Sequence, residues 1–544
     1  MKKFIAPLLV GAALTSAFAA DDLAKEVAAL KAQMAELKNA QTKINIDALR
    51  QQVSEIKAHD AGDNIKWNVD FRTAYDVVDY KIGAGMGSSG AFIPAVGPAG
   101  MFGMFKPVAK STADNALWSN KLILGMASQP AENLVFKGAL GVYKTYGQSS
   151  FNTAQNSMFQ NFDWYGTQKQ NDATIRLREA YFLYFGDMGD VHYSASFGRR
   201  PSVDGFMTNL RADNENPASP VGHNINMEFD GASFKFDLDK LTGISGMYVK
   251  LCLGRGFSDT TGMYSQDAST GGFNPPYVKA GANGNMDLAG LLVQFYDDGQ
   301  YKVMANVFKG WNMMDIGNDI VFDMSNPAAM TYSMASNGFH DVGDLTGASL
   351  SLQVNGIGDG ISDFLDDSIF FISYAVSKTD PTNKITNRFL DTDDNDLSAM
   401  LMPMLGGLTA QQIADFMGQG MLGSTDKETG SSVYAGFQFP GFMQGQRVGL
   451  EYNHGSKYWR SFTYGEDTLA GSKLATRGDA YEIYYTLPLV GKNLTAQLSY
   501  VYMDYDYAGS DMFFGQTGNT AGLMGAMPFV EKAYNIHASL RYRY

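Results

Sequence analysis

The sequence predicts an all-β transmembrane barrel, antiparallel and up-and-down, with about 16 strands, preceded by a short α-helical coiled coil. Hydrophobic residues make up 45% of the 544 positions and aromatic residues 13%, but charged residues only 18%, and 59 residues are glycine. No stretch of about 20 apolar residues follows the N-terminus, which excludes a bundle of membrane helices. Short segments of alternating apolar and polar residues, joined by connections that are alternately short and long, instead favour strands that cross a membrane.

Residues 1–20 have the parts of a secretory signal peptide. Lys2 and Lys3 precede an apolar run over residues 4–14, and small residues surround Phe18. The run is too short for a membrane helix, and two aspartates follow it. We expect export across the inner membrane of a Gram-negative bacterium.

Residues 21–60 show heptad spacing and predict a helix with one apolar stripe. The seam residues are Leu23, Val27, Leu30, Met34 and Leu37. A single helix cannot bury such a stripe, so it either self-associates or lies on another surface. The mixture of Leu, Met and Val at the seam does not decide between a coiled coil of two helices and one of three. We expect a periplasmic coil that makes a homo-oligomer, with a trimer favoured, and that contacts peptidoglycan in one alternative.

Residues 63–544 form the predicted barrel. The candidate strands lie near 65–77, 116–128, 134–146, 173–185, 191–200, 225–238, 246–255, 287–296, 300–310, 345–355, 368–377, 431–439, 446–455, 478–487, 494–506 and 530–544. Eight long loops alternate with seven short turns, as in outer-membrane barrels with long external loops and short periplasmic turns. This pattern places both ends of the barrel on the periplasmic side.

Several segments resemble the general sixteen-stranded porins. The last strand alternates up to Tyr542 and Tyr544, residues 176–181 read Arg-Leu-Arg-Glu-Ala-Tyr, and 201–224 occupies the position of the third loop. The signal, coil and barrel together, with residues 198–205, are similar to an uncharacterised family of bacterial outer-membrane proteins. The resemblance implies that Tyr542 and Tyr544 are read by the barrel-assembly machinery. It also implies a constriction loop, whose charged residues would be Asp204, Arg211, Asp213 and Glu215.

The predicted inner wall is basic, although the protein has a net charge of −14. Strand alternation turns a set of arginines into the lumen, and the expected pore-lining residues are Arg72, Arg176, Arg178, Arg200 and Arg447. Rings of wall charge set ion selectivity, so a mild anion preference is one hypothesis. The alternative is that loop carboxylates neutralise the arginines. Alternation also puts Glu179 on the lipid face, where a neighbouring subunit could cover it.

Other chemistry is weakly indicated. Residues 391–396 are rich in Asp but lack the glycine and terminal glutamate of an EF-hand, which favours a solvated loop over a calcium site. Residues 397–422 are apolar and Met-rich, and they could plug the barrel mouth. Cys252 is the single cysteine and is expected to be a wall residue. No hydrolase or zinc motif is present, so we expect no enzyme activity, cofactor or metal.

The predicted function is an outer-membrane, porin-like channel for passive or weakly selective diffusion of small hydrophilic solutes, including anions. One alternative is a structural envelope tether, with a plugged barrel and a cell-wall-binding coil. Another is uptake of an apolar substrate through the Met-rich segment. Outer-membrane lipid is the expected surrounding, and the acidic balance argues against a nucleic-acid partner.

Overall fold

The structure is a computed structural model. It describes residues 65–86, 93–97, 100–104, 107–147, 173–200, 203–214, 216–260, 264–266, 271–279, 283–323, 325, 331–382, 388–397, 421–463, 468–507 and 530–544. The signal peptide, the coil with its seam residues, and Glu215 lie outside these residues. None of the helices in the described part is long and apolar enough to cross a membrane.

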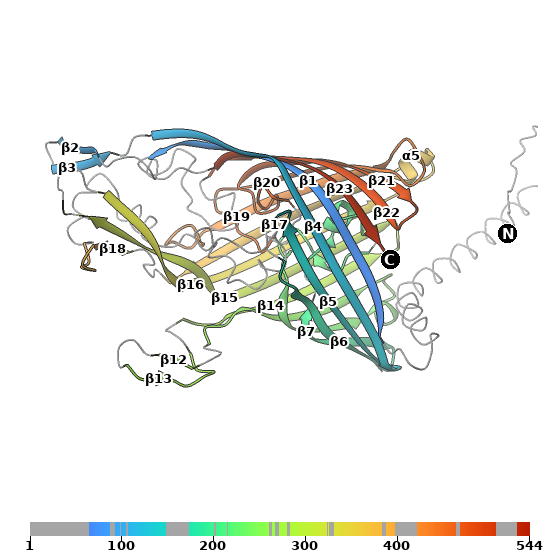
Figure 1. Ribbon diagram of the computed structural model, residues 1–544. Coiled ribbons are helices and arrows are strands. Elements are labelled where there is room, and N and C mark those ends of the chain that lie inside the picture. Colours follow the sequence, from blue (N-terminus) through green and yellow to red (C-terminus); the bar gives the residue numbers. More distant parts are fainter. Residues whose placement is uncertain are drawn as a thin grey trace, which may run out of the picture. The chain divides into compact units, whose positions relative to one another are not determined.

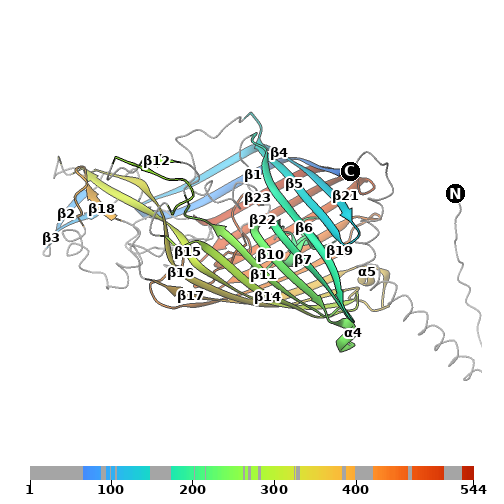
Figure 2. The same cartoon turned by 90° about the horizontal axis from the view of Figure 1, so that it is seen from below.

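Sixteen strands form one closed antiparallel barrel (Figures 1 and 2). In chain order they are β1 (Lys66–Met86), β4 (Pro107–Ala131), β5 (Leu134–Thr145), β6 (Arg176–Met188), β7 (Val191–Arg200), β10 (Phe229–Asp237), β11 (Tyr248–Phe257), β14 (Met286–Asp297), β15 (Tyr301–Asp323), β16 (Thr331–Asn355), β17 (Ile369–Pro381), β19 (Thr429–Pro440), β20 (Arg447–Gly455), β21 (Gly478–Val490), β22 (Leu494–Tyr505) and β23 (Val530–Arg543). Each of the sixteen predicted segments overlaps one of these strands, so the barrel of the predicted fold class is confirmed.

The barrel closes where the first strand meets the last. β1 pairs with β23 from Asp70 opposite Arg543 to Ile82 opposite Val530. Two further backbone hydrogen bonds join Val69 and Tyr544, with N to O distances of 3.0 and 2.9 Å. Closure leaves no free sheet edge, which a spanning sheet requires because lipid cannot satisfy backbone groups.

The remaining elements are short and lie in the connections. They are β2 (Ile93–Gly97), β3 (Gly100–Met104), β8 (Gly205–Phe206), α3 (Thr208–Arg211), β9 (Ser219–Val221), α4 (Asp239–Thr242), β12 (Ser265–Gln266), β13 (Phe273–Asn274), α5 (Asp363–Asp366) and β18 (Arg388–Asp391). Helices α4 and α5 lie in two of the predicted short turns. The hairpin of β15 and β16 extends past the neighbouring strand β14 (Figure 1). β14 pairs with β15 only as far as Trp311, whereas β15 and β16 stay paired as far as Asp323 and Thr331.

The outer surface of the barrel is apolar. Large apolar side chains are exposed at every second position of many strands. Examples are Leu251, Leu291, Leu350, Ile483 and Leu540, each 39% to 55% exposed. A soluble β-sandwich buries such a face, because apolar surface left in water costs roughly 25 cal/mol per Å². An exposed apolar band outside a closed barrel is typical of a membrane barrel.

A β-bulge corrects one prediction about β6. The register between β5 and β6 shifts, so that Ala139 faces Glu179 while the next residue, Leu140, faces Leu177. Arg178 is the extra residue, and a bulge of this kind reverses the alternation beyond it. Residue 139 faces inward, so Glu179 faces inward too. Its predicted lipid-facing position was wrong, and with it the inference that another subunit covers this charge.

Candidate functional site

The third long connection, residues 201–228 and here called L3, lies inside the barrel. Phe206, Met207 and Val221 of L3 are at most 1% exposed and pack against the wall residues Phe371 and Tyr434. Met207 adopts φ 78°, a left-handed conformation that is unusual for a residue with a side chain. L3 therefore fills part of the lumen with apolar side chains and does not lie over the barrel mouth.

The tip of L3 is bound to the last strand. Arg541 on β23 donates to the Ala212 carbonyl at 2.7 Å and also pairs in bidentate fashion with Asp70 of β1, at 2.8 and 2.5 Å. Arg543 donates to the Asp213 carbonyl at 2.7 Å and pairs with the carboxylate of the same residue. L3 leaves the wall at β7 and is anchored at β23, so it crosses the lumen.

Further wall contacts hold the short helix α3 of L3. Gln497 of β22 donates to the Arg211 carbonyl at 3.0 Å, and Gln438 of β19 donates to the Leu210 carbonyl at 3.3 Å. The Arg211 guanidinium lies 3.6 Å from the carboxylate of Glu482 on β21. Arg211 and Asp213, both predicted loop residues, therefore hold L3 in place through ion pairs.

A second connection, residues 456–477 and here called L7, also folds into the lumen. Trp459, Phe462 and Leu474 are at most 1% exposed. Phe462 packs against Phe229 of β10 and Phe308 of β15, with ring centroids 6.0 and 5.4 Å away. Sequence analysis did not anticipate this second inserted loop.

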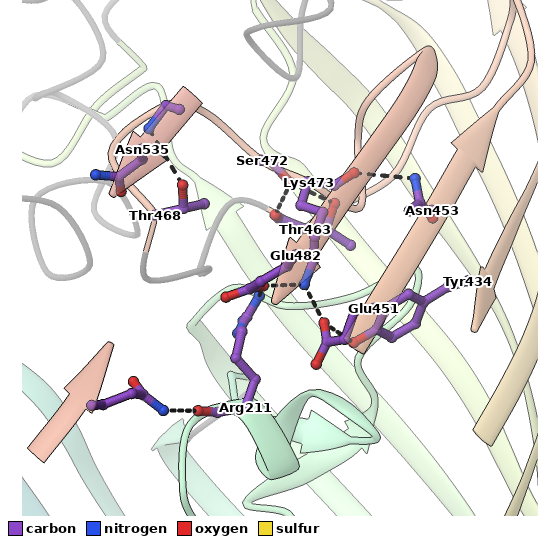
Figure 3. A network of polar contacts seen from close by, with 12 residues as sticks. Arg211, Tyr434, Glu451, Asn453, Thr463, Thr468, Ser472, Lys473, Glu482 and Asn535 are labelled. Carbon is purple, nitrogen blue, oxygen red and sulfur yellow. Dashed lines mark hydrogen bonds and ion pairs between the residues drawn. The ribbon is translucent and has the colours of Figure 1, made fainter. Parts of the chain in front are cut away.

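One buried lysine anchors L7 to the wall (Figure 3). The Lys473 ammonium is fully buried, contacts the Glu451 carboxylate and lies 2.5 Å from Glu482 Oε2. Tyr434 donates to Glu451 Oε2 at 2.8 Å. Because Glu482 also pairs with Arg211, this network joins L7, the wall and L3 into one unit.

The base of L3 is fixed by neutral polar contacts. The two ring nitrogens of His223 lie 2.8 Å from Ser373 Oγ and 2.9 Å from Ser432 Oγ. Burial lowers the pKa of His223 to about 3, although a hydrogen bond with Asn453 acts in the opposite direction. The imidazole is therefore neutral at physiological pH. Beside it, Asn224 and Asn306 exchange hydrogen bonds of 3.0 and 2.8 Å.

L3 and L7 divide the lumen into two sides. On the packed side, formed by the inner wall of β14 to β22, wall residues such as Leu292, Phe371, Tyr434 and Tyr484 are at most 2% exposed. On the accessible side, formed by the inner wall of β1, β4 to β7, β10 and β11, many long inward side chains are only half-buried, although Asp76, Tyr143 and Arg178 are buried. The half-buried ones include Asp70, Arg72, Lys121, Lys137, Arg176, Glu179, Tyr181, Arg200, Lys235, Lys250 and Cys252.

The predicted pore-lining arginines fall into different environments. Arg72 donates to the Tyr143 hydroxyl at 2.8 Å. Arg178 is buried and bound to Glu228 at 3.0 Å, and Arg199 lies 3.4 Å from the same carboxylate. Arg176 and Arg200 are half-buried on the accessible side. Arg447 is half-buried on β20, opposite Thr486 and apart from the others.

The other predicted residues are placed as follows. Asp204 accepts a hydrogen bond from Asn214 within L3 at 3.3 Å. Tyr542 and Tyr544 are exposed on the outer face of the last strand, 44% and 78% respectively. The Asp391 carboxylate accepts hydrogen bonds from the backbone of Asp393 and Asn395, which closes a local turn. Across the described residues no cluster of His, Cys, Asp and Glu could hold a metal ion.

The signal for the L7 anchor appears only when the register of two strands is known. Glu451 and Glu482 face each other directly across β20 and β21. Two like charges in that arrangement repel each other, so a nearby cation is needed. Lys473 lies in the loop between these two strands and is the nearest candidate along the chain.

Comparison with known proteins gives the family. The model of the family described as "Protein of unknown function (DUF3373)" matches residues 111–544. The chain belongs to the DUF3373 family. The matched span runs from β4 to the last strand of the barrel and so contains L3 and L7. No curated protein sequence is significantly similar to this DUF3373 chain.

Solved structures similar to this DUF3373 protein include outer-membrane proteins. OprB of Pseudomonas putida is 11% identical with a TM-score of 0.41, over 88% of this chain and 94% of that one. An anion-selective porin from Comamonas acidovorans is 10% identical with a TM-score of 0.39, over 88% and 99%. The outer-membrane channel DcaP of Acinetobacter baumannii is 11% identical with a TM-score of 0.36, over 89% and 99%. Similarity at this level transfers neither solute nor selectivity to the DUF3373 chain.

Proposed function

We propose that the protein is an outer-membrane channel through which small hydrophilic solutes diffuse passively along the accessible side of the lumen. The observation that carries the proposal is the contrast between the two sides. L3 and L7 bury most of the inner wall of β14 to β22, whereas many long polar side chains on β1 to β11 remain half-buried. Sixteen-stranded barrels are wide enough to hold an aqueous channel.

The outer surface supports the membrane location. Its apolar band fits lipid, and the polar inner wall fits water, which is the arrangement of a membrane barrel. The exposed aromatic residues Tyr542 and Tyr544 on the closing strand fit recognition by the barrel-assembly machinery. We further propose that the coil with seam residues 23–37 lies in the periplasm and makes a homo-oligomer, with a trimer favoured, and we retain peptidoglycan as its alternative partner.

Single-channel conductance of the purified full chain in a planar bilayer tests the channel. The expected result is steady conductance that falls when Cys252, on the accessible side, is modified by a bulky thiol reagent. The C252S variant should conduct normally and resist the reagent.

A matched control places the cysteine on the packed side. In the C252S background, S432C puts a thiol at a site that is 1% exposed, and the reagent should leave its conductance unchanged. A correctly folded barrel that conducts no ions would contradict the channel and favour a plugged barrel that tethers the envelope.

A further inference from the structure

The inner wall of β7, β10 and β11 has one level without side chains. Gly198, Gly231 and Gly254 face each other across the three strands. A Cβ atom added to Gly198 would lie 2.2 Å from the Ala180 carbonyl oxygen, and one added to Gly231 would lie 1.9 Å from the Leu253 carbonyl oxygen. The backbone therefore requires glycine here. As a consequence, solutes meet bare backbone at this level of the lumen.

Small polar residues line the next level. Ser196, Ser233 and Cys252 face each other there, and each lies two residues from the glycine on its own strand. Ser196 is 2% exposed, and within the described residues its hydroxyl has no hydrogen-bond partner. A buried hydroxyl without a partner is uncommon, because desolvation costs roughly 1 to 3 kcal/mol. Its hydrogen-bonding capacity is not used by the described residues.

Two cations flank these two levels. Arg200 lies two residues after Gly198 on β7, and Lys250 lies two residues before Cys252 on β11. The charge of Arg200 acts on Lys250 and on Tyr181, which faces Gly198. Among the described residues no carboxylate lies within ion-pair distance of either cation.

Two of the nearby carboxylates are already engaged. Lys235 is the direct cross-strand neighbour of Lys250, but its ammonium lies 2.5 Å from Asp237 and 4.4 Å from the centre of the Tyr248 ring. Asp230 lies 3.6 Å from Arg199. Like charges placed opposite each other destabilise a sheet, so Lys250 beside Lys235 needs another source of negative charge.

We propose that Arg200 and Lys250, with the hydroxyls of Ser196 and Ser233 between them, form a binding site for oxyanionic solutes that carry carboxylate or phosphate groups. The two cations compensate the ligand charge, and the hydroxyls donate to its oxygens. The site rests on the proposed channel, because solutes reach it only through the lumen. It concentrates anions at one position, whereas a diffuse basic wall would attract them along its whole length.

The single native cysteine makes the site testable without an introduced probe. Cys252 in the full-length barrel is treated with two methanethiosulfonate reagents of similar size, one bearing a sulfonate and one a trimethylammonium group. Modification is followed by intact mass, and each rate is divided by the rate with free cysteine. The expected ratio favours the sulfonate reagent by about tenfold, because fixed charges raise the local concentration of counter-ions.

Substitutions and competition identify the residues responsible. K250Q and R200Q should each bring the ratio towards one. The control K302Q removes a lumen lysine that is paired with Asp297 at 3.1 Å, and it should leave the ratio unchanged. Inorganic phosphate should slow modification by the sulfonate reagent more than chloride does at equal ionic strength.

Three results would overturn the site. They are equal rates for the two reagents, a ratio that survives K250Q, and failure of both reagents to reach Cys252 in the folded barrel. Conductance measured on the same preparation separates this failure from failure of the channel. A barrel that conducts but reacts equally fast with both reagents supports the channel and contradicts the site. A barrel that conducts no ions but reacts faster with the sulfonate reagent contradicts the channel and supports the site.

Discussion

The two sides of the lumen differ in the residues of their inner wall and in whether loops cover those residues. On the packed side, the wall residues are Leu, Met, Phe and Tyr together with small hydroxyl residues, and two loops cover them. On the accessible side, long cationic residues alternate with glycine and serine along β7, β10 and β11, and few residues, such as Phe229, join the core. A sixteen-stranded barrel can therefore carry a packed core on one side while it keeps a polar wall accessible on the other.

Electrostatics show the same contrast. The packed side holds Lys473 between Glu451 and Glu482, with all three side chains at most 4% exposed. Breaking such a buried pair is costly, because each remaining carboxylate loses the ammonium that neutralises it at a site where water cannot replace it. On the accessible side, Lys250 retains some contact with solvent, so its charge can act on passing solutes.

The largest expected effect comes from removing the L7 anchor. K473M leaves two glutamates buried opposite each other and should lower the free energy of unfolding by about 3 to 5 kcal/mol. Urea unfolding of the folded barrel, followed by tryptophan fluorescence, measures this change. Release of L7 should also raise the single-channel conductance.

The exposed ion pair of Lys427 with Asp380 provides the control, since its side chains are 62% and 51% exposed. K427M should change the stability by no more than about 1 kcal/mol. Equal losses in the two variants would show that the buried network does not hold L7.

The next effect concerns the apolar core. Phe462 of L7 is fully buried, and F462A should cost about 3 kcal/mol, the lower end for a lost phenylalanine, because the neighbouring methionines adapt to space. The same unfolding experiment measures it. F442A, at a position that is 98% exposed, should change the stability by less than about 0.5 kcal/mol. If F462A behaves like F442A, the lumen has no core.

The smallest effect, compared over a single pH unit, is a dependence on pH. His223 has its pKa lowered to about 3 in the folded barrel, whereas the unfolded chain titrates near 6.5. Between these values the unfolded state binds more protons, so the free energy of unfolding falls as pH is lowered, by about 1.4 kcal/mol per pH unit from this residue. Unfolding curves collected between these values test the slope. H223N should remove it, and H454N, at an exposed histidine, should not.

Sequence reasoning recovered the barrel because strand alternation and loop length are local signals. All sixteen strands could be placed, and residues 201–224 could be assigned to a third loop. The inserted L7 was missed because a buried loop is recognised by its partners, and Glu451 and Glu482 lie on strands whose register is unknown from the sequence. The Glu179 error has a similar cause, since one extra residue at Arg178 reverses every later assignment on β6.

The accessible side was predicted in outline only. Arg72, Arg176 and Arg200 face the lumen, but Arg178 is neutralised by Glu228. Ion pairing depends on segments that are far apart in the sequence, and simple alternation cannot supply it. Lys250 is of interest because the neighbouring Lys235 is paired with Asp237. That ion pair is visible only in three dimensions.

The attachment of L3 to β23 has a consequence for the order in which the chain matures. Arg541 and Arg543 lie on β23, and the same strand seals the barrel against β1. L3 therefore gains its anchor only when β23 has taken its place in the barrel. A truncated or unsealed chain lacks this anchor, so the narrowing of the lumen follows closure of the barrel.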